Sequence, residues 1–140
     1  MADLRPGLTH EITWTVEERH LASTLGSGLP PVFATPMLGA LFEECARVLA
    51  DSRLPEGQLT VGTWITVHHT APTPLGMKVR ARAELVDVEG RRLRFKLEAW
   101  DDVEPVGSGE HERFIVDAAR FEKRLAEKSA RVQAGQDGGA

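Results

Sequence analysis

Three polar residues of the chain could together carry acyl-transfer chemistry: Thr35, Glu43 and His69. A carboxylate and an imidazole can exchange protons with a reacting water or a leaving group, and a hydroxyl can orient them or contribute directly. The three lie in the runs FATPMLGALFEECA and VGTWITVHHTAPTPLG, which read as the start of a helix and the end of a strand. We expect a candidate site where these two elements meet.

The helix is predicted from Thr35 to about Asp51, with Thr35 as its N-cap and Pro36 as its first helical residue. Its apolar stripe, typical of a helix buried against a sheet, comprises Leu38, Leu41, Phe42, Cys45, Val48 and Leu49. Glu43 lies within a second strip of small residues on the same helix, so a thin ligand could approach its carboxylate. Burial there would raise the pKa of Glu43 toward that of a general base. The alternative is an exposed ion pair between Glu43 and Arg47.

The strand is predicted over residues 59–70, and strict alternation assigns its side chains to two faces. His69 then shares the inner, apolar face with Leu59, Ile65 and Val67, while His68 points the opposite way. A β-bulge in this strand would exchange the faces. A histidine on an apolar face can also be purely structural, and Gly62 marks either a simple bend or the close approach of a backbone or ligand.

The remaining elements predict one α+β domain over residues 1–128. Residues 8–16 alternate as a first strand, and residues 17–34 hold enough glycine and proline to form a loop or short helical turn that could act as a lid. Three further strands with a tight turn at Gly90 lead to a helix over about 118–128, and residues 129–140 are expected to be disordered. One strand, a long helix and four strands in meander order favour a curled antiparallel sheet around a central helix.

Composition narrows the function classes. The 140 residues carry a formal charge of −4, which disfavours nucleic acid as the main partner. The sequence shows neither an export signal nor an apolar run long enough for a membrane helix, so we expect a cytoplasmic protein without a membrane partner. The single cysteine, Cys45, lies on the apolar stripe and is interpreted as core, and no spacing of histidines and cysteines suggests a metal site.

Four segments together resemble the hot-dog-fold thioesterases typified by fluoroacetyl-CoA thioesterase. They are the helix start at Thr35–Cys45, the run Val67–Pro74, the hairpin Val88–Arg92 and the run Gly107–Arg113, and the resemblance covers roughly residues 8–125. It implies a hot-dog fold, a Thr35, Glu43 and His69 site, and a glycine, Gly62, near the acyl group. It also implies a homodimer, or a higher oligomer, with sites at or near the interface.

The function expected from this resemblance is hydrolysis of an acyl-CoA thioester, with coenzyme A as part of the substrate and no cofactor. The family prototype has an aromatic lid, whereas this chain has Leu25-Gly-Ser-Gly-Leu29 and only Phe33, so we expect a small or medium acyl group at Phe33. Arg80 and Arg82, with other cations of the outer sheet face, could bind the coenzyme A phosphates or simply face solvent. The alternatives are an acyl-CoA-binding protein without activity and an enoyl-CoA hydratase.

Overall fold

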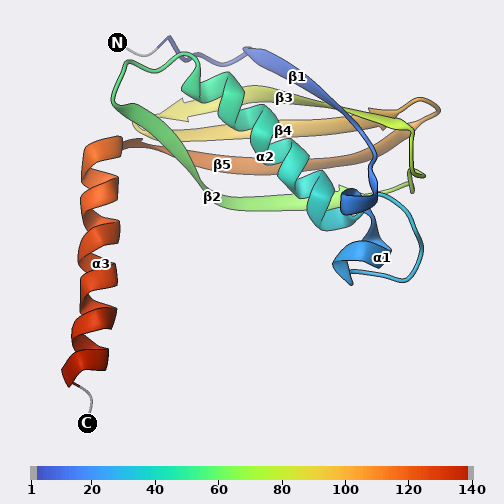
Figure 1. Ribbon diagram of the computed structural model, residues 1–140. Helices are drawn as coiled ribbons and strands as arrows, with labels where there is room; N and C mark the ends of the chain where they lie inside the picture. Colours follow the sequence, from blue (N-terminus) through green and yellow to red (C-terminus); the bar gives the residue numbers. More distant parts are fainter. Residues whose placement is uncertain (1–2, 139–140) are drawn as a thin grey trace.

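The structure, a computed structural model, describes residues 3–138 and consists of one curled antiparallel sheet wrapped around a central helix (Figure 1). The helix, α2, spans Thr35–Asp51, so it begins one residue before Pro36, the predicted first helical residue, and ends where predicted. The five strands are β1 (Thr9–Thr15), β2 (Gln58–His69), β3 (Lys78–Glu89), β4 (Arg92–Asp101) and β5 (Pro105–Asp117). Five strands on one face of a long helix confirm the predicted α+β class.

The core lies between α2 and the concave face of the sheet. The buried side chains of α2 recur at helical spacing and are Leu38, Leu41, Phe42, Cys45, Ala46, Leu49 and Ala50. Opposite them, β3 contributes Ala81 and Ala83, whose small side chains let the helix approach closely, and β4 contributes Phe95 and Leu97. Burial of this wide stripe, rather than intrinsic helix propensity, accounts for most of the helix's stability.

The strand order is β1-β3-β4-β5-β2, so only β3, β4 and β5 form a meander. The predicted four-strand meander is wrong in one respect, because β2 pairs with β5 and not with its sequence neighbour β3. The segment between β2 and β3 contains Pro72 and Pro74 and leaves the sheet instead of turning back as a hairpin. As a result β2 is an edge strand, with one side free in the single chain.

A bulge in β2 changes which residues face α2. The register with β5 shifts between Gly62 and Trp64. Before the bulge the buried residue is Thr60 instead of the predicted Leu59, and after it the alternation matches the prediction for His69. An extra residue in one strand exchanges the two faces, which strict alternation cannot anticipate.

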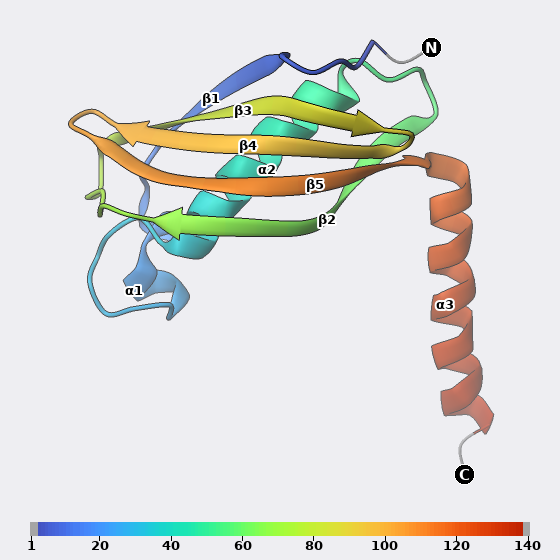
Figure 2. The same cartoon turned by 180° about the vertical axis from the view of Figure 1, so that it is seen from behind.

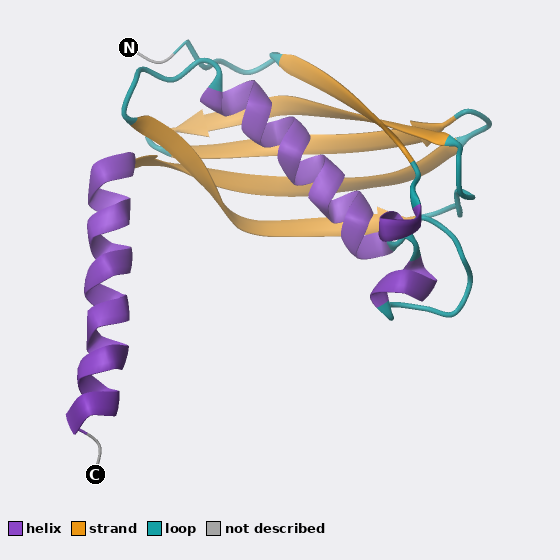
Figure 3. Cartoon of the chain, in the orientation of Figure 1, coloured by secondary structure: helices purple, strands orange, loops and turns teal. Residues whose placement is uncertain are grey.

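The predicted lid is a compact excursion between β1 and α2. It contains a 3₁₀ turn at Glu18–His20 and the short helix α1 at Ala22–Leu25 (Figure 3). Backbone bridges from Leu21 to Phe33 and from Val32 to Pro74 hold it in place. Its tip exposes Leu29, which is 94% accessible. The lid therefore has a fixed base beside the start of α2 and an open apolar tip.

The C-terminal helix, α3, spans Ala118–Gly138 and differs from the expectation. Residues 129–138, predicted to be disordered, continue the helix, because Ser129–Ala134 contains no helix breaker; residues 139–140 lie outside the described part. Helix α3 starts beside the first residue of β2, since the Ala118 N–H donates to the Gly57 carbonyl at 2.9 Å, and it stands away from the sheet (Figure 2). Within residues 3–138 no helix has the length and apolar character of a membrane span.

Candidate active site

A hydroxyl and an imidazole meet where α2 begins and β2 ends. Thr35 Oγ1 lies 2.8 Å from Nδ1 of His69. The prediction that Thr35 caps α2 is wrong: Thr35 is already helical, and the N-cap residue, Ala34, makes no side-chain capping bond. The Thr35 hydroxyl is therefore available to His69, at a separation suited to proton transfer or orientation.

The His69 imidazole is held in an apolar surrounding. The ring of Phe33 meets it edge to face, with centroids 6.4 Å apart, and Phe33 in turn contacts the buried ring of His20. Burial lowers the pKa of His69 below its ordinary value of 6.5, so the neutral form predominates near pH 7. Nε2 of His69 is buried and has no hydrogen-bond partner among the described residues. One ring nitrogen can thus serve as a proton acceptor or a hydrogen-bonding group for a substrate.

Two cavities meet at Thr35. One, of about 270 Å³, is lined by Phe33, Thr35 and His69 together with lid residues. The other, of about 370 Å³, runs along α2 and is lined by Thr35, Glu43 and small or apolar neighbours: Pro36, Gly39, Ala40, Ile65 and Val67. Only the first part of the predicted small-residue strip lines this groove, through Gly39 beside Glu43, whereas its later members, Ala46 and Ala50, are buried in the core. Thr35 is shared by both cavities.

Glu43 shares this groove but does not touch the Thr35–His69 pair. Eight residues separate Glu43 from Thr35 along α2, which is about 12 Å of helix rise. Its side chain is exposed in the single chain, contrary to the expected burial, and the structure shows no ion pair to Arg47, which instead lies 4.0 Å from Asp51. The neighbouring Glu44 accepts a hydrogen bond from the Trp14 indole at 2.9 Å.

A buried polar network lies under the other end of β2. The Arg113 guanidinium donates to Thr60 Oγ1 at 2.7 Å and lies 3.1 Å from His111 Nε2, while Thr60 donates to Asp51 at 2.7 Å. Gly62 passes directly over these groups, because a Cβ there would lie 3.1 Å from the His111 ring. The close approach predicted for Gly62 is therefore made by side chains of its own chain.

Glu43 acts electrostatically on this same network. Burial lowers the pKa of His111, and the charge of Glu43 is a weaker influence in the opposite direction. The same holds for the pKa of Arg113. Sequence alone does not predict this cluster, since its only signal is a histidine and an arginine at alternate positions of one strand, opposite a glycine. The chain thus carries two separate polar clusters, Thr35 with His69 and, at the other end of β2, Thr60 with Arg113 and His111, with Glu43 acting on the second.

Comparison with known proteins places the chain in a family. A family model described as fluoroacetyl-CoA-specific thioesterase matches residues 16–119. A fluoroacetyl-CoA thioesterase from Streptantibioticus cattleyicolor is 40% identical over 116 residues, which are 82% of this chain and 83% of that protein. The chain belongs to the fluoroacetyl-CoA-specific thioesterase family.

Solved structures agree with this assignment. A mutant of the fluoroacetyl-CoA-specific thioesterase FlK in complex with fluoroacetate and CoA superposes with a TM-score of 0.79 at 35% identity, covering 84% of this chain and 99% of that chain. A Thermus thermophilus protein described as a thioesterase superfamily member gives a TM-score of 0.89 at 25% identity, covering 96% and 99%. The predicted hot-dog fold and the resemblance to these thioesterases are confirmed. The predicted enzyme class, thioester hydrolase, is confirmed as well, because the chain is homologous to a fluoroacetyl-CoA thioesterase.

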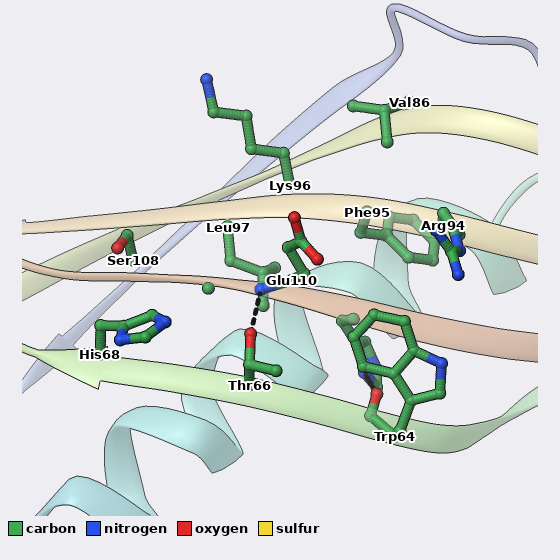
Figure 4. A pocket seen from close by; sticks show the side chains of 12 residues that line it. Trp64, Thr66, His68, Val86, Arg94, Phe95, Lys96, Leu97, Ser108 and Glu110 are labelled. Carbon is green, nitrogen blue, oxygen red and sulfur yellow. Dashed lines mark hydrogen bonds between the residues drawn. The ribbon is translucent and has the colours of Figure 1, made fainter.

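A hollow of about 600 Å³ in this thioesterase homologue lies on the outer face of the sheet (Figure 4). Trp64, Thr66 and His68 of β2 line it beside Lys96 and Glu110, and a hydrogen bond joins the Glu110 N–H to Thr66 Oγ1 at 3.0 Å. The predicted opposite orientation of His68 and His69 is confirmed, because His69 lines the cavity beside the lid. The outer hollow contains none of Thr35, Glu43 and His69.

Arg80 and Arg82 also lie on the outer face. Both guanidinium groups stack over the Trp100 ring, at 4.9 and 5.4 Å from its centroid, and Arg82 lies 3.4 Å from Glu98. The structure therefore does not bring them to the Thr35–His69 pair, and their contact with coenzyme A phosphates stays a prediction. An outward arginine on a strand stacks readily on a neighbouring indole.

Cys45 is part of the core, as expected. Its Sγ is buried and donates to the His10 carbonyl at 3.0 Å, and burial raises the pKa of the thiol to about 11. A thiol in this state is a poor nucleophile. No group of histidine, cysteine, aspartate and glutamate side chains within residues 3–138 has the arrangement of a metal site.

Proposed function

We propose that this protein hydrolyses acyl-CoA thioesters with small or medium acyl groups, using Thr35, Glu43 and His69. The observation that carries the proposal is the 2.8 Å contact between the Thr35 hydroxyl and a neutral imidazole at the junction of two cavities. Family membership supports a thioester as substrate. The cavities suit a thioester whose carbonyl lies at Thr35, with the acyl group on one side and the pantetheine arm on the other.

The site is completed by a second copy of the chain. Strand β2 is a free sheet edge twelve residues long, and such edges readily pair with another strand. A twofold antiparallel pairing of two β2 strands places the end of one strand opposite the start of the other. The half-site of Thr35 and His69 in one subunit then faces the half-site of Glu43, Gly62 and Arg113 in its partner.

This arrangement accounts for two features of the single chain. Glu43 is exposed and about 12 Å of helix rise away from its own Thr35, so it is poorly placed to act with that residue. Gly62 is itself exposed although it packs over the buried Arg113 and His111, so its backbone is free to contact a group of the partner subunit. We therefore assign Glu43 to the site of the other subunit.

In the proposed reaction the Glu43 carboxylate takes a proton from water, whose oxygen attacks the thioester carbonyl carbon. The positive end of the α2 dipole favours the negative charge that develops there. His69, held by Thr35, orients the reacting groups. The carbon–sulfur bond then breaks, the departing thiolate receives the proton from Glu43, and the carboxylic acid and free coenzyme A leave.

The direct test is release of free thiol from a panel of acyl-CoA substrates of increasing chain length. Hydrolysis is expected to be fastest for short or medium chains and to fall by about a hundredfold or more in His69→Ala. Tight binding without thiol release would favour an acyl-CoA-binding protein, and addition of water to enoyl-CoA would favour a hydratase. Either result would remove the proposal.

We also propose a cytoplasmic location. It is supported by Cys45, which is buried and reduced, and which has no second cysteine in the chain to pair with. Detection of the protein outside the cytoplasm in a fractionated native host would contradict this location.

A further inference from the structure

Helix α3 carries an apolar stripe that its own chain does not cover. Phe121, Leu125 and Val132 recur at intervals of four and seven residues and so share one side of the helix. Leu125 is 51% and Val132 60% exposed, and in the described part of the chain the sheet meets α3 only near its first turn. A helix of 21 residues with such a stripe gains most of its stability by packing, so this side requires a partner.

The direction of α3 indicates which surface that partner offers. The helix starts beside Gly57, at the beginning of β2, and runs past the β2 edge in both views of the molecule (Figures 1 and 2). In the antiparallel dimer proposed above, the region beyond this end of β2 is occupied by the opposite end of the partner's strand. The lid and the Thr35–His69 pair of the partner subunit lie at that end.

We propose that α3 of each subunit docks on the lid of its partner and closes the partner's active site. This inference rests on the proposed dimer. The lid offers the matching apolar surface, because Leu25 is 45% and Leu29 94% exposed at its tip. Covering these two leucines with Leu125 and Val132 removes four large apolar side chains from water.

Charge supports the same contact. Helix α3 has five basic residues against three acidic ones, whereas the whole chain has a net charge of −4, so the helix is basic and the body of the chain acidic. Three cations flank or interrupt the apolar stripe and line one surface hollow with a single carboxylate, Glu127: Arg124, Lys128 and Arg131. In the docked position these cations border the partner's cavity, where coenzyme A phosphates would be attracted to them.

Photocrosslinking in the full-length protein tests the contact directly. Leu125→benzoylphenylalanine, in a dimer whose two subunits carry different isotope labels, is expected to form adducts with residues 21–34 of the other subunit. Ala126→benzoylphenylalanine, turned about 100° around the helix, is the matched control and should not. Adducts confined to the probe's own chain, or none at position 125, would overturn the inference.

Kinetics test the consequence for the site. Leu125→Glu combined with Val132→Glu should raise KM for acyl-CoA at least about tenfold, while Ala126→Glu with Ala130→Glu adds the same charge to the other side and should change KM by less than about twofold. Equal effects of the two pairs would overturn the inference. If no acyl-CoA is hydrolysed, adducts between position 125 and the partner's lid still establish the docking, and the proposed function alone fails. A monomer in sedimentation would remove the docking even if hydrolysis is observed.

Discussion

The contact between Thr35 and His69 makes a quantitative prediction for Thr35→Val. Valine keeps the β-branched shape of threonine and removes only the hydroxyl. Because the hydroxyl does not cap α2, the helix start loses no bond, and Pro36 continues to fix the first turn. The free energy of unfolding should therefore fall by no more than about 1 kcal/mol.

The effect on catalysis should be much larger. Nδ1 of His69 has Thr35 Oγ1 as its hydrogen-bond partner, and Nε2 is buried without one. Holding the ring in its catalytic position with Nδ1 unpaired costs about 1–3 kcal/mol. The ring avoids this cost in the free enzyme by rotating away, so the penalty reduces catalysis and not stability. At about 1.4 kcal/mol for each factor of ten, kcat/KM should fall roughly ten- to a hundredfold.

The assay is thiol release at pH 7, with urea unfolding of the same preparations. Thr35→Ser keeps the hydroxyl and should retain activity within about threefold of the wild type, since the hydrogen bond is preserved. If Thr35→Val hydrolyses its best substrate at a near-normal rate while folded, the hydroxyl does not position His69, and the reasoning from this contact is refuted.

Three further predictions follow from other parts of the structure. Glu43→Gln should lower kcat by about a hundredfold or more, and single turnover in ¹⁸O-labelled water should place the label in the released acid and not in the Glu43 carboxylate, where its appearance would show a nucleophile instead of a base. Burial lowers the pKa of three histidines: His20, His69 and His111. Below the ordinary pKa of about 6.5 the unfolded chain binds more protons than the folded one, so the urea midpoint should rise from pH 5 to 6.5 and then level off, and a constant midpoint would contradict these shifts. Gly109→Ala should destabilise the fold by about 1–3 kcal/mol because its Cβ would overlap the Thr66 carbonyl, whereas Gly135→Ala, in open space on α3, should not destabilise it; equal unfolding midpoints for the two variants would argue against the β2–β5 register.

Local periodicity predicted the elements of the fold well. The alternation on either side of Gly90 and the apolar stripe of α2 each recur within a few residues, so burial on one face determines the element. The neighbour of β2 could not be read in this way, because pairing with β5 depends on the path of the chain and not on the strand's own pattern. Helix α3 was predicted too short, since a segment without a buried face in its own chain looks like a solvated tail.

The candidate site was predictable only in part. Thr35 and His69 were selected by residue type and by the resemblance, and the structure brings them into contact. The bulge after Gly62 turns Thr60 inward, where it accepts a hydrogen bond from Arg113. Strict alternation assigns Thr60 to the outer face and so does not predict this network. Glu43 was expected to be buried, but its side chain is exposed in the single chain. In the proposed dimer the partner subunit covers it, and the pattern of one chain does not reveal such a contact.

Complementation between two inactive subunits tests whether each active site takes Glu43 and His69 from different chains. A purified dimer of one Glu43→Gln subunit and one His69→Ala subunit, joined by co-expression with two affinity tags, has one intact and one doubly altered site if each site takes Glu43 and His69 from different chains. If the site is shared between subunits, the mixed dimer should have about half of the wild-type activity, while each homodimeric variant stays at least about a hundredfold below wild type. Activity as low in the mixed dimer as in the two homodimers would contradict a shared site, because both sites would then contain one altered residue.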